Sequence, residues 1–294
     1  MITTSVLLST YNGEKYLTEQ LDSIKNQTKR VDEVIIKDDC STDGTVALIE
    51  QYIDDYKLDN WKILINKTNL GWKKNFVSML EYVNTDYFFF CDQDDIWYHD
   101  KVENMMKIVS KNEQIEVLLS DFYPFYENGK EPKRNKKLSG HTIKYSQNNF
   151  LLNRYPGCTM CLKKSVIPIY NKFWNDLIPH DSFAMLYGLA SESVYLYDCF
   201  TMYYRRHSST ATHSSVNNRI ERIHETDYYI KLLKLYKKMS NNSKTNDVSN
   251  WISIRRNALI RKKPIILLKN LKYLKLYWSI NTYIMDFICA MGIR

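Results

Sequence analysis

The 294-residue sequence lacks any apolar run long enough to cross a membrane. A spanning helix needs about 18 consecutive apolar residues, and no stretch of the chain approaches that length. The first ten residues (MITTSVLLST) also lack the basic segment and the cleavage site of a signal peptide. From these absences we expect a chain that stays in the cytoplasm.

Cysteine is sparse and follows no disulfide pattern. Six cysteines are spread over the chain, which is typical of reduced thiols in a protein of this size. Cys158 and Cys161 form a single CxxC pair without a second pair or a histidine cluster nearby. Because a structural zinc site needs four such ligands, this pair does not indicate one.

Acidic residues are scarce toward the C-terminus. Residues 219–294 contain 16 basic and 5 acidic side chains, a net charge of +11, whereas residues 1–218 carry −3. Nucleic-acid binding would require a recognisable groove-reading or aromatic module in addition to basic charge, and none is present. We therefore expect no nucleic acid partner.

The first half of the chain alternates between short apolar runs and amphipathic stretches, which is typical of an α/β fold with a mostly parallel sheet flanked by helices. We predict strands at residues 5–9, 33–37, 61–65, 87–91 and 117–120, and helices at 14–26, 45–56, 74–82 and 100–110. Later elements are strands at 157–162 and 194–197, a helix at 182–189 and an extended run at 202–206. From about residue 217 the pattern is helical, with breaks at 240–250 and at Pro264.

Polar residues follow each predicted strand, where an open parallel sheet binds its ligands. They are residues 10–13 (TYNG), 38–45 (DDCSTDGT), 66–71 (NKTNLG) and 92–95 (DQDD). Asp39 ends a buried run, where a carboxylate is costly unless it contacts a ligand. We expect Asp39 to accept hydrogen bonds from a nucleobase or a ribose.

Three carboxylates, Asp92, Asp94 and Asp95, follow the aromatic run 87–91 (YFFFC). Such charges repel one another, so together they need a cation. Their oxygens suit Mg²⁺ or Mn²⁺, which also accept ligands from substrate phosphates. The alternative is an acidic turn that caps the following helix.

Four segments resemble, in order, the inverting glycosyltransferases of family 2. They are residues 9–13, 38–45, 69–76 and 92–97, with weaker matches to about residue 212. The resemblance implies the α/β GT-A fold, a nucleotide diphosphate sugar donor and Mg²⁺ or Mn²⁺ as cofactor. It divides the chain into a GT-A domain at 1–215, with a donor half (1–110) and an acceptor half (111–215), and a helical basic region at 216–294.

The resemblance also implies a set of donor-binding side chains. They are Thr10, Tyr11, Asn12, Asp39, Asn69, Gly71, Lys74, Asp92, Gln93, Asp94, Arg205 and Arg206. The implied metal ligands are Asp92, Asp94 and His207. The segment that contains His207 (YYRRH, 203–207) continues as SST, which departs from the usual pattern of the family.

The resemblance identifies Asp181 as the catalytic base, because an inverting transfer needs a carboxylate to take the proton of the acceptor hydroxyl. Asp181 precedes an apolar helical stretch, so capping that helix is its alternative role. The acceptor-side residues implied are Gly157, Cys158, Trp97 and His180. We interpret the polar stretch 127–140 as a loop that forms an acceptor-side flap.

The His180-Asp181 pair and the DQDD run resemble the rhamnosyltransferase-like members of the family. This favours dTDP-rhamnose as donor and a lipid-linked or oligosaccharide acceptor in surface polysaccharide or capsule assembly. A UDP-hexose-dependent enzyme of the same fold is the alternative. A sugar nucleotidyltransferase is disfavoured, because residues 10–14 lack a glycine-rich loop with Arg and Lys. The alternative from another class is a non-catalytic protein that binds membrane surfaces.

The basic region contains an amphipathic pattern after residues 261–263 (RKK). Leu267, Leu271, Leu274 and Trp278 recur at helical spacing, with Lys269, Lys272 and Lys275 between them. Such a helix can lie on an anionic membrane surface, so we predict peripheral association at the inner face of the cell membrane. The alternative is a helix that packs on the catalytic domain or on another subunit. The oligomeric state stays open.

Overall fold

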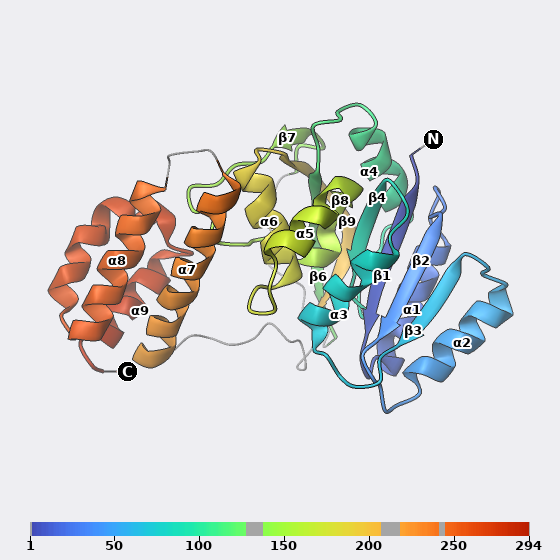
Figure 1. Cartoon of the computed structure of the whole chain (residues 1–294), viewed down its shortest axis with the longest axis horizontal. Coiled ribbons are helices and arrows are strands. Elements are labelled where there is room, and N and C mark those ends of the chain that lie inside the picture. The colour runs from blue at the N-terminus through green and yellow to red at the C-terminus, as the bar shows by residue number, and fades with distance from the viewer. Residues whose placement is uncertain (1, 128–137, 207–217, 241–244, 294) are drawn as a thin grey trace. The chain divides into compact units, whose positions relative to one another are not determined.

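The computed structural model describes residues 2–127, 138–206, 218–240 and 245–293 (Figure 1). The chain divides into two compact units. The larger unit contains residues 1–145, 154–188 and 193–209, and the smaller contains 146–153, 189–192 and 210–294. The division expected after residue 215 did not include the two short segments 146–153 and 189–192.

In the described part of the larger unit, nine strands form one sheet. In spatial order they are β3 (Trp61–Ile65), β2 (Glu33–Asp38), β1 (Thr4–Thr10), β4 (Tyr87–Cys91), β8 (Met160–Lys163), β6 (Val117–Tyr126), β9 (Val194–Arg206) and β5 (Ile96–Trp97), and β7 (Thr142–Lys144) pairs with β9. Strands β1, β2, β3, β4, β6 and β9 are parallel to one another, and the other three are antiparallel to them. This arrangement confirms the predicted mostly parallel sheet.

Helices cover both faces of this sheet. On one face they are α1 (Glu14–Lys25), α2 (Thr45–Tyr56) and α4 (Lys101–Val109). On the other they are α3 (Trp72–Ser78), α5 (Ile167–Phe173) and α6 (His180–Ala190). Short 3-10 turns complete the unit: η1 (Met79–Tyr82), η2 (Gly157–Thr159) and η3 (Lys164–Val166).

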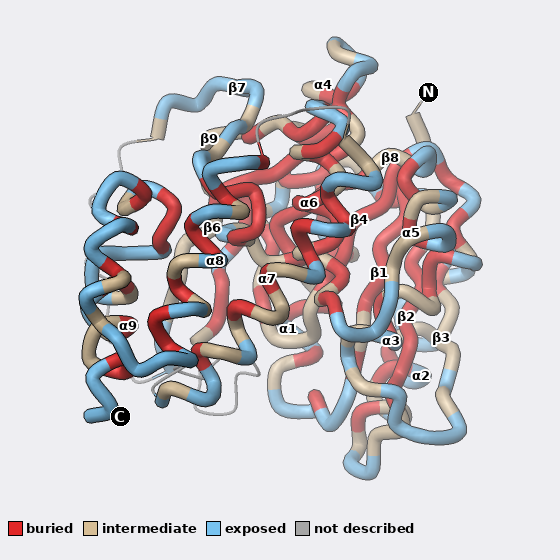
Figure 2. Tube along the Cα trace, turned by 60° about the vertical axis from the view of Figure 1, so that its left-hand side comes forward, coloured by how far each residue is buried: buried red, intermediate tan, exposed pale blue. Residues whose placement is uncertain are grey.

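The aromatic strand β4 is buried along its whole length (Figure 2). Phe89 contacts Trp97 on one face, whereas Phe88 and Phe90 lie on the other, where Phe90 contacts Phe76. This alternation is the two-residue period of a strand, and each fully buried Phe contributes roughly 1.5–3 kcal/mol. The aromatic run therefore fixes β4 in the centre of the sheet and its carboxyl end among the loops.

The structure differs from the sequence-based prediction at three places in this unit. The strand predicted at 157–162 begins as the 3-10 turn η2 and becomes β8 only at Met160. The runs predicted at 194–197 and 202–206 are one strand, β9, because β6 pairs along its length through irregularities near Ser120 and Asp121. Strands β5 and β7 and helix α5 were not predicted, because they are too short to show a period.

The described part of the smaller unit is helical, as expected. It contains α7 (Arg219–Met239), α8 (Asn246–Arg261), η4 (Pro264–Leu276) and α9 (Ile280–Ala290). The stretch predicted as an amphipathic α-helix is largely the 3-10 helix η4, so its leucines do not share one face: Leu267 is buried, whereas Leu271 is exposed. Among the described residues, no helix combines the length and the apolar character needed to span a membrane.

Candidate active site

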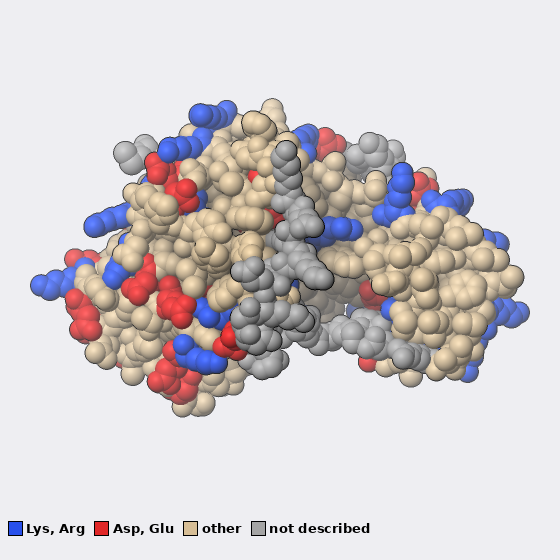
Figure 3. Space-filling view, turned by 180° about the vertical axis from the view of Figure 1, so that it is seen from behind, with Lys and Arg blue, Asp and Glu red and all other residues tan. Residues whose placement is uncertain are grey.

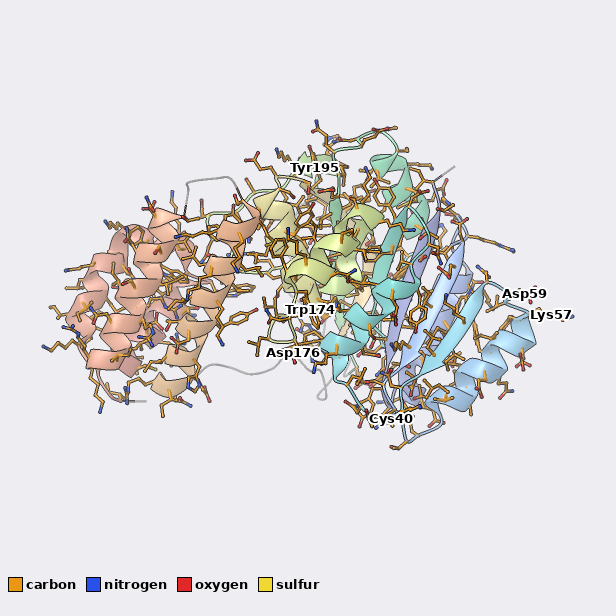
Figure 4. The ribbon with its side chains drawn as sticks, viewed as in Figure 1. Cys40, Lys57, Asp59, Trp174, Asp176 and Tyr195 are labelled. Atoms are coloured by element: carbon orange, nitrogen blue, oxygen red, sulfur yellow. The ribbon has the colours of Figure 1, made fainter. Side chains whose placement is uncertain are left out.

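The carboxyl ends of β1, β2 and β4 lie side by side at one edge of the sheet. Thr10 pairs in register with Asp38, and Leu8 pairs with Cys91. The polar loops that follow these strands therefore start next to one another. Figure 4 shows Cys40, in the loop after β2, at this edge.

Asp38 and Asp39 are buried and hold loops in place. The Asp38 carboxylate accepts a hydrogen bond from Oγ1 of Thr10 at 2.9 Å. The Asp39 carboxylate accepts the backbone N–H groups of Leu70 at 2.7 Å and Gly71 at 2.8 Å. Asp39 is 2% exposed, so it shapes the loop after β3, and its contact with a nucleoside stays a prediction.

The loop after β1 is clamped from two sides. The Gln93 side chain accepts the backbone N–H of Tyr11 at 2.8 Å and donates to its carbonyl at 3.0 Å. The Asn12 side chain accepts the backbone N–H of Thr42 at 2.8 Å. Asn12 (φ 46°) and Cys40 (φ 67°) both have the left-handed backbone conformation, which costs energy in non-glycine residues and concentrates at functional sites. The ring of Tyr11 is exposed at this rigid edge.

The segment after β3 forms a second rim. Gly71 has φ +80°, a conformation that glycine adopts most readily, and its N–H also donates to Oδ1 of Asn69 at 2.9 Å. Trp72 is 39% exposed next to this turn. Nζ of Lys74 lies 3.0 Å from a carboxylate oxygen of Asp176, in the connection between α5 and α6 (Figure 4). Sequence reasoning missed this ion pair, because its partners are distant in sequence.

The acidic turn after β4 concentrates negative charge. Ligand atoms of Asp92, Asp95 and Cys158 all lie within 4.8 Å of one another. Burial, followed by the charge of Asp94, raises the pKa of Asp92 to about 7. The same two causes raise the pKa of Asp95 well above its usual value. The protein groups around this turn therefore do not stabilise the ionised forms of Asp92 and Asp95.

This donor set fits a hard divalent cation. Oδ2 of Asp95 is buried and has no hydrogen-bond partner among the residues that the structure describes. Burial raises the pKa of the Cys158 thiol well above its usual value, so the thiol is neutral near pH 7 and suits packing better than ligation. The carboxylates of Asp92, Asp94 and Asp95 are the oxygen ligands that Mg²⁺ and Mn²⁺ prefer.

Asp181 lies in the first turn of α6, close to this acidic turn. Burial raises its pKa to about 6, and the N–H groups of Ser182 and Gly157 lower it in part. The charge of Asp181 in turn contributes to the raised pKa of Asp92. The helix α6 begins at His180, one residue before Asp181. A carboxyl with a pKa just below neutrality can accept a proton at pH 7.

His180 belongs to the core below Asp181. It is 4% exposed and stacks on Phe76 at a centroid distance of 4.0 Å. Burial lowers its pKa to about 3, and neither ring nitrogen has a hydrogen-bond partner in the described part of the chain. A Cβ added to Gly157 would overlap the imidazole. The predicted acceptor-side pair Gly157 and His180 is therefore a close packing contact, which requires glycine at position 157.

Arg205 joins the acidic turn to α1. Its backbone N–H donates to Asp95 at 3.0 Å, its Nε to the carbonyl of Asp94 at 2.7 Å, and its guanidinium pairs with Glu19 at 2.8 Å. Arg205 is 7% exposed. Its guanidinium is thus occupied in holding the turn, a role that the sequence did not reveal.

Arg206 and His207 end the segment 203–207, for which we predict contacts with the donor and the metal. The guanidinium of Arg206 lies over the ring of Tyr204, 4.6 Å from its centroid. His207 lies outside the described residues, as does most of the predicted acceptor-side flap. Of the three predicted metal ligands, Asp92 belongs to the cluster with Asp95 and Cys158, whereas Asp94 does not. All three stay predictions.

Lys101 supports the site from below and was missed by sequence reasoning. It is 0% exposed, and its Nζ donates to the Cys158 carbonyl at 2.6 Å and lies 4.0 Å from the ring centroid of Trp97. Burial lowers the pKa of Lys101 to about 8. Trp97 and Cys158 are 3% and 1% exposed, so these two predicted acceptor-side residues belong to the core and not to an open surface.

Known proteins are similar to this chain in sequence and in fold. The model of the family "Glycosyl transferase family 2" matches residues 5–178. dTDP-rhamnosyl transferase RfbG of Shigella flexneri is 33% identical over 225 residues, which cover 71% of this chain and 75% of that protein. S. aureus TarS 1–349 in complex with UDP-GlcNAc superposes with a TM-score of 0.63 at 17% identity, over 99% of this chain and 91% of that chain.

A second solved structure is the mannosyltransferase PcManGT of Pyrobaculum calidifontis, in complex with GDP-Man and Mn²⁺. It superposes with a TM-score of 0.57 at 14% identity, over 99% of this chain and 86% of that chain. These neighbours share the GT-A arrangement of sheet and helices, and the family model spans more than half of the 294 residues. The chain therefore belongs to glycosyl transferase family 2 and is a glycosyltransferase with the GT-A fold.

Proposed function

We propose that this enzyme transfers a sugar with inversion from a nucleoside diphosphate to an acceptor hydroxyl, with Asp181 as the general base. The observation that carries the proposal is the raised pKa of Asp181, about 6, beside the acidic turn after β4. The acceptor oxygen forms a bond to the anomeric carbon, the bond to the diphosphate breaks, and the hydroxyl proton passes to the Asp181 carboxylate.

The nucleotide lies, in this proposal, across the ends of β1 and β2. Tyr11, in the loop after β1, and Trp72, at the start of α3 after β3, have rings that are 47% and 39% exposed, and aromatic rings bind nucleobases by stacking. Thr10 is buried and donates to Asp38, so it acts by holding the loop. Preorganised loops of this kind bind the donor without paying much ordering entropy.

In this proposal the diphosphate lies at the acidic turn, where Asp92 and Asp94 would hold Mg²⁺ or Mn²⁺, with Asp95 next to them in sequence. His207 remains a predicted ligand. A bound divalent metal supplies positive charge that offsets the charge on the leaving diphosphate. Arg205 keeps the turn in place through Asp94 and Asp95. Arg206 adds a cation at the end of β9.

The favoured donor is dTDP-rhamnose, because RfbG, named a dTDP-rhamnosyl transferase, is 33% identical over most of both chains. A UDP-hexose is the second candidate, because TarS has the same fold in complex with UDP-GlcNAc. The acceptor in this proposal is a lipid-linked sugar or an oligosaccharide, used in surface polysaccharide assembly on the cytoplasmic side.

Donor binding tests the proposal directly. dTDP-rhamnose, UDP-glucose, UDP-GlcNAc and GDP-mannose are each added with and without Mn²⁺, and unfolding is followed by thermal shift and binding by calorimetry. A ligand at 100 times its Kd should raise the free energy of unfolding by about 2.7 kcal/mol. We expect one donor to do so, and only with the metal.

The matched control is the double variant Asp92→Asn and Asp94→Asn, which keeps side-chain size and removes two charges. It should lose the metal-dependent stabilisation. If no donor binds the parent with metal present, or if the double variant binds equally well, the proposed site is wrong.

A further inference from the structure

The 3-10 segment η4 bends at Tyr273, whose backbone is not helical (φ −107°, ψ 16°), and before this bend side chains three residues apart share an edge. Along the whole segment, the three sets of residues spaced in this way differ in exposure and character. One edge is buried and consists of Leu267, Asn270, Tyr273 and Leu276. A second is apolar and exposed and consists of Ile265, Leu268 and Leu271, which are 67%, 46% and 51% exposed. A third is basic and exposed and consists of Lys269, Lys272 and Lys275.

The buried edge anchors η4 in the smaller unit. Nδ2 of Asn270 donates to the carbonyl of Trp251 at 3.3 Å and to the Tyr277 hydroxyl at 2.9 Å. The Tyr283 hydroxyl donates to the carbonyl of Leu267 at 3.2 Å. These bonds fix the rotation of the helix about its axis, so its apolar and basic edges stay directed away from the core of this unit.

The six exposed residues of these two edges form what we name the η4 face: Ile265, Leu268, Lys269, Leu271, Lys272 and Lys275. Leu268, Lys269, Leu271 and Lys272 also border a shallow groove against α8. In Figure 3, Lys and Arg side chains lie along the edge of a broad, mostly uncharged surface of the smaller unit. Residues 261–276 contain no acidic side chain, so the η4 face is uniformly basic.

We propose that the η4 face binds an anionic lipid surface. Exposed Leu and Ile gain free energy by leaving water, and adjacent lysines gain it from lipid phosphates, which together are typical of segments that lie in the membrane interface. A second copy of this chain fits the face less well, because a twofold contact would bring together two copies of a face with three lysines and no acidic side chain. The inference extends the proposed function, since a lipid-linked acceptor is presented at such a surface.

Helix α7 of the same unit provides the contrast. Its exposed side chains from residue 231 to 238 are all lysines, and the apolar side chains between them are buried. If charge alone determined lipid binding, α7 would serve as well as η4. The proposal requires the two properties together, and of these two helices η4 has both.

The test is flotation of the full chain with vesicles of phosphatidylcholine alone or mixed with phosphatidylglycerol. We expect binding to the mixed vesicles only. Lys269→Gln with Lys272→Gln should weaken it about 30-fold, at ~1 kcal/mol per lysine. Leu268→Ser with Leu271→Ser should also reduce it at least tenfold. The matched control, Lys234→Gln with Lys237→Gln on α7, should change it less than about threefold.

Three outcomes would overturn the proposal. They are equal binding to neutral vesicles, equal losses in the η4 and α7 variants, and loss of a dimer in the leucine variant with vesicle binding unchanged. The last outcome would assign the face to a second copy. Donor binding, measured by calorimetry in the same variants, should stay at the parent level. A loss of vesicle binding with donor binding unchanged concerns the η4 face alone, whereas a parent that binds no donor concerns the proposed function.

Discussion

Both units of this glycosyltransferase contain buried carboxylates, but the partners of these carboxylates differ. In the smaller unit, Asp286 is 0% exposed and accepts hydrogen bonds from Arg222 at 2.7 Å and Arg255 at 2.6 Å. In the larger unit, Asp95 is also 0% exposed, yet Oδ2 has no hydrogen-bond partner among the described residues. Asp286 therefore has arginine counter-charges, whereas the Asp95 side chain has no such partner among the described residues.

The nearby cations of the larger unit do not change this. The Lys101 ammonium donates to the Cys158 carbonyl rather than to a carboxylate. The Arg205 guanidinium contacts the Asp94 carbonyl and Glu19, and only its backbone N–H reaches Asp95. A buried charge without a counter-charge is costly. The Mg²⁺ or Mn²⁺ of the proposed function would supply the counter-charge that the described side chains do not give to Asp95.

Of the variants that distinguish the two units, Asp181→Asn should have the largest effect, which is on the rate of transfer. Asp181→Asn removes the proposed base while keeping its size, and should lower the transfer rate by roughly 10²–10⁴-fold. Because Asp181 has a raised pKa from burial, its loss should leave the free energy of unfolding unchanged or higher. Activity assays together with thermal unfolding measure both.

The control for Asp181→Asn is Asp59→Asn, an exposed position after α2 (Figure 4). It should leave transfer at the parent rate. Donor affinity of Asp181→Asn, measured by calorimetry, should also match the parent. A loss of donor binding equal to the loss of transfer would place Asp181 in the donor site instead.

Asp286→Asn should have the opposite profile. It removes the buried carboxylate that both Arg222 and Arg255 contact and leaves Arg255 with Glu225 alone as an acidic partner among the described residues, so the smaller unit should lose about 3–5 kcal/mol of unfolding free energy. Asp227→Asn removes an ion pair with Arg256, in which the Arg256 side chain is 38% exposed and the Asp227 side chain 40% exposed. It should lower the free energy of unfolding by only about 0–1 kcal/mol. Denaturant unfolding measures both, and equal effects of the two variants would contradict the contrast drawn here.

The sequence predicted the parallel half of this fold because its strands are apolar runs that differ sharply from their surroundings. The run 87–91 illustrates this, since five buried residues followed by three carboxylates specify a central strand and a charged turn. The sequence did not predict elements whose secondary structure depends on contacts with distant parts of the chain. Strand β5 has two residues and exists only through its pairing with β9. The segment η4 is a 3-10 helix, whose hydrogen bonds span three residues rather than four, and the spacing of its leucines did not indicate this difference.

The residues of the site were predictable as a group, but their contacts were not. Asp39 was expected to face the nucleoside, and its oxygens accept backbone N–H groups 31 and 32 residues away. Lys101 stands at the start of a helix, where the sequence gives no sign of burial, yet it is 0% exposed. Hydrogen bonds between loops distant in sequence depend on the folded geometry, which local patterns do not contain.

The smallest expected effect sharpens the contrast at Asp92, whose pKa is raised from 3.8 to about 7. The folded state then binds more protons than the unfolded state between these two values. Stability of the larger unit should therefore fall as pH rises through this range, and level off above it. The full shift would correspond to about 4 kcal/mol, but Asp92 is only half-buried and solvent screens its charge. Asp92→Asn should therefore raise the free energy of unfolding at pH 8 by about 1 kcal/mol, or roughly 2–4 °C in Tm.

Mn²⁺ should act in the opposite direction in the parent. It binds the deprotonated carboxylates, so the rise in Tm that it causes should grow as pH increases from 5.5 to 8, and should be small in Asp92→Asn. Thermal scans at several pH values measure this, and the transition that Asp286→Asn does not move identifies the larger unit. If Mn²⁺ stabilised the parent equally at every pH, or the variant as much as the parent, the uncompensated charge at Asp92 would not be the one that receives the metal.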